Sequence, residues 1–170
     1  MNIRPANLED APALAHIHVA SWRHAYAGIV AAETLSNLSV ESRTQQWQAA
    51  LKQDESARTC LFVGQNASGE LLGFASGGPQ RDETLAYDGE LYAIYLLKEA
   101  QQQGLGQQLF RAVAEHLQKN QFNNLLVWVL KENSAVAFYK KMGGQYLTEK
   151  TIEINGQSLP EQAYVWPNLN

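Results

Sequence analysis

The stretch Ala100–Phe110, AQQQGLGQQLF, decides the fold of this chain. The apolar residues from Leu105 to Leu117 follow the i, i+4, i+7, i+8 spacing of an amphipathic helix that begins at the glycines. The first N–H groups of a helix have no internal partner, and glycines let a phosphate approach them. The stretch is therefore either a plain tight turn or a phosphate-binding loop. It is neither a Walker loop nor a dinucleotide-binding fingerprint, because no Gly-Lys-Ser/Thr and no third spaced glycine follow.

The composition favours one globular domain spanning residues 1–170. Hydrophobic residues make up 45% of the chain, which is enough for a packed core. The net charge is -4 and no basic tract stands out, so we expect no nucleic-acid partner. Cys60 is the single cysteine, which excludes a disulfide within the chain. Without a secretory signal or an apolar window of about 18 residues, we expect a cytoplasmic protein with no membrane partner.

Periodicity and turn residues predict an alternation of strands and helices on both sides of this stretch. Asp10, followed by Pro12, is expected to cap the first helix. Residues 77–89 are expected to form a surface loop, and Asn155-Gly156 a hairpin turn. This order predicts an α/β (α+β) fold with a mixed sheet covered by helices. The expected strands are 2–6, 59–65, 70–78, 89–97, 123–130 and two within 151–166, and the expected helices are 11–26, 39–52, 105–117 and 132–144.

Two motifs in order resemble the GNAT superfamily of N-acetyltransferases. The first is Gln101-x-x-Gly104-x-Gly106 after the strand LYAIYLL, and the second is KENSAVAFYKKMGG after the strand LLVWVL. The resemblance implies a single-domain fold: a central, mostly antiparallel sheet of about seven strands, a splayed parallel pair, and helices on both faces. It also implies acetyl-CoA as co-substrate and no metal. Lys98 replaces a frequent proline, and Gln102 and Gln103 replace a frequent Gly-Lys pair, so one positive contact to phosphate is missing.

The resemblance also implies which residues contact the co-substrate. The backbone of Ile94 and Leu96 would pair with the pantetheine arm like an added strand. Asn133 would contact the same arm, although by its own chemistry it is equally suited to cap the next helix. The pyrophosphate would lie against the loop residues Gln101, Gln102, Gln103, Gly104, Leu105 and Gly106.

Two residues are candidates for proton transfer. Tyr139 matches the family's tyrosine and, with a reference pKa of about 10, can protonate the leaving thiolate. Its alternative is a core tyrosine on an amphipathic helix. Glu90 is the candidate general base, because a period of two places Glu90, Tyr92, Ile94 and Leu96 on one face. Its alternatives are a solvated charge at a strand end and a charge that only attracts a cationic substrate.

The segment SWRHAYAGIV is the candidate acceptor site. Trp22 and Tyr26 are suited to form an aromatic wall for an amine, or are simply two core aromatics. The segment also resembles a bacterial subgroup that includes polyamine acetyltransferases. The four histidines form no metal-binding pattern, and Cys60 lies in an expected core strand.

The predicted function is transfer of an acetyl group from acetyl-CoA to a primary amine of a small molecule. The acceptor would be polyamine-like, amino-acid-like or an antibiotic, and it would attack directly in a ternary complex. Two alternatives are a non-catalytic acyl-CoA-binding sensor and an acetyltransferase that acts on a protein amine. Members of this family are often dimers, so a homodimer is expected, although no interface is visible in the sequence.

Overall fold

The computed structural model describes residues 1–52, 58–82 and 84–169. Its strands belong to one seven-stranded sheet in the order β1-β2-β3-β4-β5-β7-β6. The strands are β1 (Asn2–Pro5), β2 (Cys60–Gln65), β3 (Leu71–Pro79), β4 (Gly89–Leu96), β5 (Leu125–Leu130), β6 (Gln145–Ile154) and β7 (Gln157–Trp166). The helices are α1 (Ala11–Ala25), α2 (Ala32–Ser36), α3 (Val40–Leu51), α4 (Leu105–Lys119) and α5 (Ala135–Lys141). Two 3-10 turns, Leu8–Asp10 and Lys98–Ala100, precede α1 and α4.

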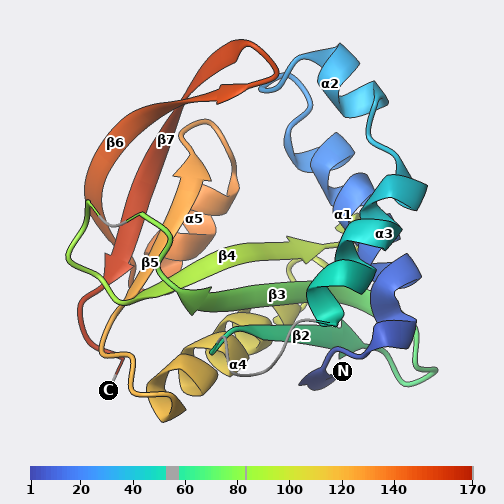
Figure 1. The fold of residues 1–170 in the computed structure, drawn as a ribbon, viewed down its shortest axis with the longest axis horizontal. Helices are drawn as coiled ribbons and strands as arrows, with labels where there is room; N and C mark the ends of the chain where they lie inside the picture. Colours follow the sequence, from blue (N-terminus) through green and yellow to red (C-terminus); the bar gives the residue numbers. More distant parts are fainter. Residues whose placement is uncertain (53–57, 83, 170) are drawn as a thin grey trace.

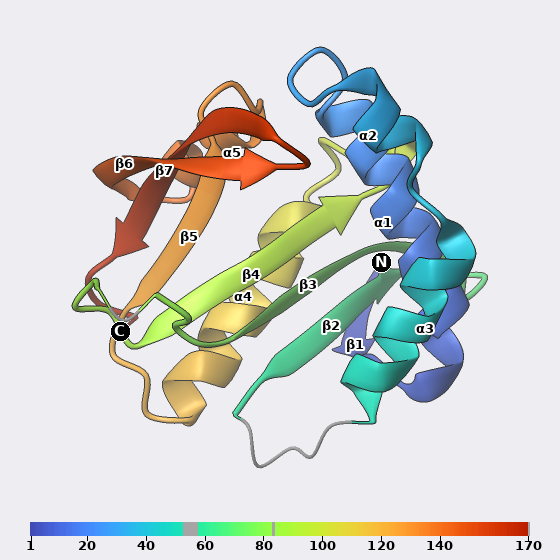
Figure 2. The same ribbon diagram turned by 45° about the horizontal axis from the view of Figure 1, so that its top comes forward.

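Helices cover both faces of the sheet, as Figures 1 and 2 show. Helices α4 and α5 lie on one face, where α4 contributes Leu105, Leu109, Val113 and Leu117 to the largest apolar cluster. Helices α1 and α3 lie on the other face, where Leu14 and Ile17 of α1 pack against Val63 and Phe74. The fold class expected from the sequence is confirmed.

Strands β4 and β5 form the parallel pair, and they separate early. Two positions pair, Gly89 with Leu125 and Glu90 with Leu126. Beyond them the strands diverge, and Figure 2 shows β4 turning toward α1 while β5 turns toward β6 and β7. A gap therefore opens at the carboxyl end of β4, where the stretch Ala100–Phe110 begins.

Several boundaries differ from the sequence prediction. Strand β3 runs to Pro79, so the expected loop 77–89 begins three residues later, and β6 begins at Gln145 rather than near Thr151. Helix α2 was not predicted, because five residues are too few to show a helical period. The Asn155-Gly156 turn is confirmed, with both residues at positive φ (47° and 81°).

Asp10 does not cap α1, contrary to the sequence prediction. Its side chain makes no capping hydrogen bond to α1. Its carboxylate instead accepts hydrogen bonds from the Arg4 guanidinium at 2.7 and 2.8 Å and from the Asn7 backbone N–H at 2.8 Å. Asn7 is the residue that caps the 3-10 turn before α1. The acidic residue before the helix therefore ties the helix to β1.

Candidate active site

The gap between β4 and β5 exposes backbone groups of β4. The Leu97 N–H donates to the carbonyl of Leu72 on β3 at 2.9 Å. Backbone groups alternate in direction along a strand, so those of Ile94 and Leu96 point away from β3 and toward the gap. The Leu96 carbonyl accepts from the Ser21 hydroxyl at 3.0 Å, which ties α1 to this end of β4. These are the two residues that the family resemblance selected.

A bulge changes which side chains share a face of β4. Gly77 pairs with Leu91 and Ser76 with Ala93, so Tyr92 is skipped in the register. Leu91, Ile94 and Leu96 consequently pack on the α4 side of the sheet. The expectation that Glu90 shares a face with Ile94 and Leu96 was wrong, because the extra residue shifts the period of two.

The turn before α4 has the form that a phosphate-binding loop needs. Gly104 is the N-cap in the left-handed region at φ 83°, and no side chain caps the helix there. Leu105 is fully buried, so it anchors the turn, while residues 101–104 are exposed. The first N–H groups of α4 therefore face solvent at the positive end of the helix dipole. Gln102, at φ 60°, also adopts the left-handed conformation.

Two loop glutamines have local partners. The Gln103 amide donates to the Glu99 carbonyl at 2.6 Å, and the Gln101 amide donates to the Leu96 carbonyl at 3.5 Å. These two side chains stabilise the shape of the loop through bonds to its own backbone carbonyls. A bound phosphate would then be held mainly by backbone N–H groups, as the missing Gly-Lys pair suggested.

Tyr139 lies inside α5, close to the gap. It is 4% exposed, and its ring packs against Phe138 and Trp166 at 5.4 and 6.3 Å between centroids. Burial, together with the neighbouring phenol of Tyr95, raises the pKa of Tyr139. The phenol therefore stays protonated across the physiological range and can donate a proton.

Asn133 lies just before α5, six residues before Tyr139. It is 7% exposed, and its side-chain oxygen accepts from the Ala135 N–H at 2.9 Å. Ser134, which directly precedes α5, makes no side-chain cap bond, so Asn133 supplies the side-chain hydrogen bond at this helix start. The expected contact to a pantetheine arm stays a prediction, for which the side-chain amide N–H group is the part left available.

Glu90 lies at the paired end of β4, away from the open gap. It is 2% exposed, and its carboxylate accepts from the Arg81 backbone N–H at 2.9 Å and from the Arg81 guanidinium at 2.5 and 3.2 Å. Arg81 also lies over the Tyr92 ring at 4.2 Å. Both guanidinium nitrogens donate to Oε1 and the backbone N–H donates to Oε2, so a role as base requires Arg81 to release the carboxylate. That role stays a prediction.

Trp22 and Tyr26 meet at the carboxyl end of α1, with ring centroids 4.7 Å apart. They pack with Val30, Leu130 and Leu159 in an apolar cluster that joins α1 to the β5 and β7 strands. Burial, and then the phenol of Tyr95, raise the pKa of Tyr26. The two aromatics therefore contribute to a core cluster, and their expected role as an aromatic wall for an amine stays a prediction.

His18 and Tyr95 extend this aromatic group and were missed by sequence reasoning. Their ring centroids are 5.0 Å apart. Among the described residues, neither ring nitrogen of His18 has a hydrogen-bond partner. Burial, with a smaller effect of Arg43, lowers the pKa of His18 to about 4. His18 is thus a neutral aromatic spacer, and the clue in the sequence was its position on the buried face of α1.

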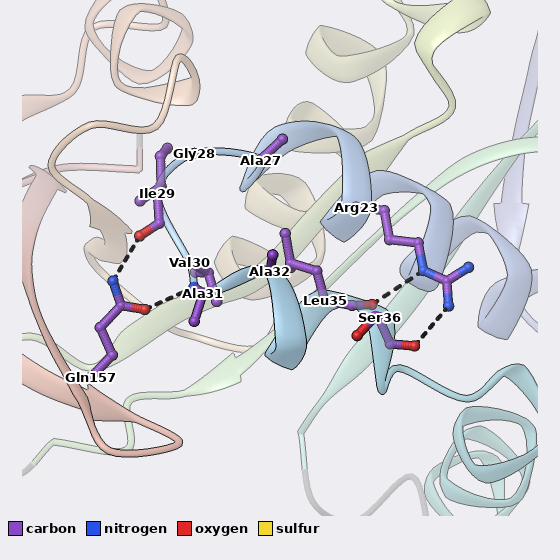
Figure 3. A pocket seen from close by; sticks show the side chains of 10 residues that line it. All are labelled: Arg23, Ala27, Gly28, Ile29, Val30, Ala31, Ala32, Leu35, Ser36 and Gln157. Carbon is purple, nitrogen blue, oxygen red and sulfur yellow. Dashed lines mark hydrogen bonds between the residues drawn. The ribbon is translucent and has the colours of Figure 1, made fainter.

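The side chain of Gln157 holds the segment between α1 and α2 to the start of β7. Gln157, at the start of β7, accepts from the Ala31 N–H at 2.8 Å and donates to the Ile29 carbonyl at 3.0 Å (Figure 3). Arg23 donates to the carbonyls of Leu35 and Leu38 at 3.2 and 2.9 Å. A cavity of about 710 Å³ lies between these two anchors. We call the Gln157 bonds to residues 29 and 31 the loop latch.

No group of three or more metal-ligating side chains is present among the described residues. In the same part of the chain, no helix combines the length and the apolar character that crossing a membrane requires.

Known proteins share this sequence and fold. A family model described as FR47-like protein matches residues 81–152. An uncharacterized N-acetyltransferase, YuaI, of Bacillus subtilis is 38% identical over the whole chain and 95% of its own length. Spermidine N(1)-acetyltransferase of Thermoplasma acidophilum is 26% identical over 84% of this chain and 87% of its own. The solved PaiA N-acetyltransferase of the same organism, in complex with coenzyme A, has a TM-score of 0.71 at 20% identity and covers 95% of this chain and 96% of its own.

The expected contacts of β4, of the glycine start of α4 and of Tyr139 with a coenzyme A thioester stay predictions. The sequence match to YuaI spans both chains almost completely, and the structural match covers nearly the whole fold. This chain therefore belongs to the N-acetyltransferases of the GNAT superfamily.

Proposed function

We propose that the enzyme acetylates a primary amine of a small molecule by direct attack in a ternary complex. The supporting observation is the divergence of β4 and β5 beside an apolar cluster in which Trp22 and Tyr26 of α1 pack with Leu130 and Leu159. An acceptor that binds between α1 and the diverging strands would be a small molecule. The relative that acts on spermidine is consistent with such an acceptor.

In the proposed reaction, the neutral amine attacks the thioester carbonyl carbon, a C–N bond forms and the C–S bond breaks. Backbone N–H groups at Ile94 and Leu96 are positioned to stabilise the oxygen as charge builds. Tyr139 donates its phenolic proton to the leaving thiolate and regains a proton from the solvent. Holding both reactants in the gap supplies a large share of the rate enhancement.

The test is release of free coenzyme A from acetyl-CoA in the presence of a panel of primary amines. Turnover of at least one small amine supports the proposal. Binding of acetyl-CoA without turnover across the panel would favour the sensor role instead, and turnover only with peptides would favour a protein acceptor.

Glu90→Gln separates the two roles of this carboxylate. If Glu90 is the base, kcat falls and its dependence on pH at the acid side changes. If Glu90 mainly holds Arg81, the variant loses stability, by about 1–2 kcal/mol given that Arg81 is largely exposed, and keeps its kcat. Thermal unfolding and a pH–rate profile of the same variant distinguish these outcomes.

The expected homodimer and the cytoplasmic location stay predictions. The expected absence of nucleic-acid and membrane partners also stays a prediction.

A further inference from the structure

The last peptide group of β4 is hydrogen-bonded from two sides. On one side, the Leu97 N–H donates to the Leu72 carbonyl of β3 at 2.9 Å. On the other side, the Ser21 hydroxyl of α1 donates to the Leu96 carbonyl at 3.0 Å. Ser21 is 6% exposed, so its hydroxyl needs a partner within the protein. This side chain therefore joins α1 to the carboxyl end of β4.

The bond is unusual for a serine inside a helix. A helical serine or threonine commonly donates to the carbonyl four residues earlier in its own helix. Thr44 of α3 does so, with a bond of 2.8 Å to the Val40 carbonyl. Ser21 instead reaches a strand residue that lies 75 positions away in the sequence. Its hydroxyl is thus used between two elements rather than within α1.

Ser21 takes the place that a neighbouring strand would have at this end of β4. In the described part of the chain, β4 pairs with β5 at Gly89 and Glu90 and at no later residue. Both the N–H and the carbonyl of Leu96 face the gap, because these two groups point to the same side of a strand. Ser21 satisfies the carbonyl, which the Gln101 amide reaches only at 3.5 Å. The Leu96 N–H therefore remains available for a ligand, and Ser21 fixes its direction.

Ser21 also fixes where the expected acceptor wall lies. Trp22 directly follows Ser21, and Tyr26 stands at the carboxyl end of the same helix. A shift of α1 relative to Leu96 would move both aromatics away from the carboxyl end of β4. In enzymes, a misplacement of about 1 Å between two reacting groups can lower the rate about a hundredfold.

We propose that Ser21 is a positioning residue for acetyl transfer, which holds the Leu96 N–H toward the thioester oxygen and α1 at a fixed distance from it. This inference rests on the proposed function, in which the Leu96 N–H stabilises the charge that builds on this oxygen. Ser21 does not touch the reacting atoms and transfers no proton. It acts through Leu96, so its loss should change the rate of transfer rather than the affinity for coenzyme A.

The test compares Ser21→Ala with Tyr92→Phe. Tyr92→Phe is the matched control, because it removes another hydroxyl that donates to a backbone carbonyl of this sheet, that of Pro79 at the paired end of β4. For an amine that wild type acetylates, Ser21→Ala should lower kcat about tenfold to hundredfold and leave the KM for acetyl-CoA unchanged. Tyr92→Phe should keep the wild-type kcat.

A second readout needs no acceptor. Infrared difference spectroscopy measures the carbonyl stretch of bound acetyl-CoA that is isotopically labelled at the thioester carbonyl. A hydrogen bond to this oxygen lowers the frequency of the stretch, so wild type and Tyr92→Phe should show a lowered band. Ser21→Ala should shift the band back toward its position in free acetyl-CoA, while calorimetry shows wild-type affinity for coenzyme A.

The two readouts separate this inference from the function on which it rests. A wild-type band at the free position, an unshifted band in Ser21→Ala or a wild-type kcat in this variant overturns the inference, even though amines are acetylated. Equal losses of kcat in Ser21→Ala and Tyr92→Phe would show a structural role only and also overturn it. If no small amine is acetylated, the proposed function fails, and the band shift alone then decides the inference.

Discussion

At the scale of single residues, Tyr139 carries the proposed proton transfer. Tyr139→Phe removes the hydroxyl and keeps the ring between Phe138 and Trp166. We expect kcat to fall by about a hundredfold or more, because general acid catalysis contributes about that much, while the KM for acetyl-CoA changes little. Steady-state kinetics check this. Tyr146→Phe, at a tyrosine that is 55% exposed, is the control and should behave as wild type. A Tyr139→Phe enzyme with wild-type kcat would remove Tyr139 from the mechanism.

The pKa of His18 predicts how the stability of the fold depends on pH. Its pKa is lowered to about 4 in the folded protein, so the unfolded chain binds the proton more tightly. Stability is therefore fully present above about pH 6.5 and is lost as the pH falls through 6.5 toward 4, by about 3 kcal/mol at most. His18→Phe should lack this loss, because the ring nitrogens make no hydrogen bonds among the described residues.

Urea unfolding of wild type and His18→Phe at several pH values measures the difference. His16→Phe, an exposed position on the same helix, is the control and should keep the wild-type slope. An equal acid slope in wild type and His18→Phe would show that other groups are responsible.

At the scale of elements, two glycine variants distinguish backbone strain from loss of coenzyme A binding at the start of α4. Gly104 and Gly28 both have positive φ, 83° and 80°, and both have open space where a Cβ would be placed. Gly104→Ala and Gly28→Ala should therefore each lose about 1–2 kcal/mol of stability from backbone strain. Only Gly104→Ala should also weaken binding of coenzyme A, measured by calorimetry. Equal binding by the two variants would mean that the glycine turn does not hold the phosphates.

The loop latch is the second prediction at this scale. Gln157→Ala removes two hydrogen bonds that fix residues 29 and 31, after α1, to the start of β7. We expect the KM for the acceptor to rise roughly three- to tenfold, because each bond contributes about 1 kcal/mol, with the KM for acetyl-CoA unchanged. Gln145→Ala, at the exposed far end of the hairpin, is the control. If both KM values rise together, the latch supports the whole fold rather than the acceptor side.

At the scale of the whole molecule, one core joins the two halves of the splayed sheet. The largest apolar cluster includes Ala75 and Leu91 from one side of the gap and Val127 and Tyr164 from the other, with α4 between them. Leu109→Ala should cost about 2–5 kcal/mol, because Leu109 is fully buried in this cluster. Far-ultraviolet circular dichroism and tryptophan fluorescence should still report one transition in urea. Separate transitions would show that the halves unfold independently.

The motifs, the helical period of α4 and the alternation of strands were enough to predict the sheet, its helices and the family. These features are local, because they depend on residues close in the chain. The sequence also selected Tyr139, Ile94 and Leu96, since each lies in a motif of fixed spacing. Short or irregular features escaped prediction, such as the five residues of α2 and the bulge at Tyr92 that moved Glu90 to the other face.

The partners of charged and polar side chains are visible only in the tertiary structure. Arg81 reaches Glu90, nine residues away in the sequence. Gln157 reaches the segment after α1, more than one hundred residues away. No local period encodes either contact. Glu161, between Leu159 and Ala163 on β7, meets Lys150 of β6 in a salt bridge that no local period encodes. Sequence spacing determined which backbone and motif residues are candidates for the site, whereas burial and long-range pairing determined which side chains already have partners, because these depend on where distant strands meet.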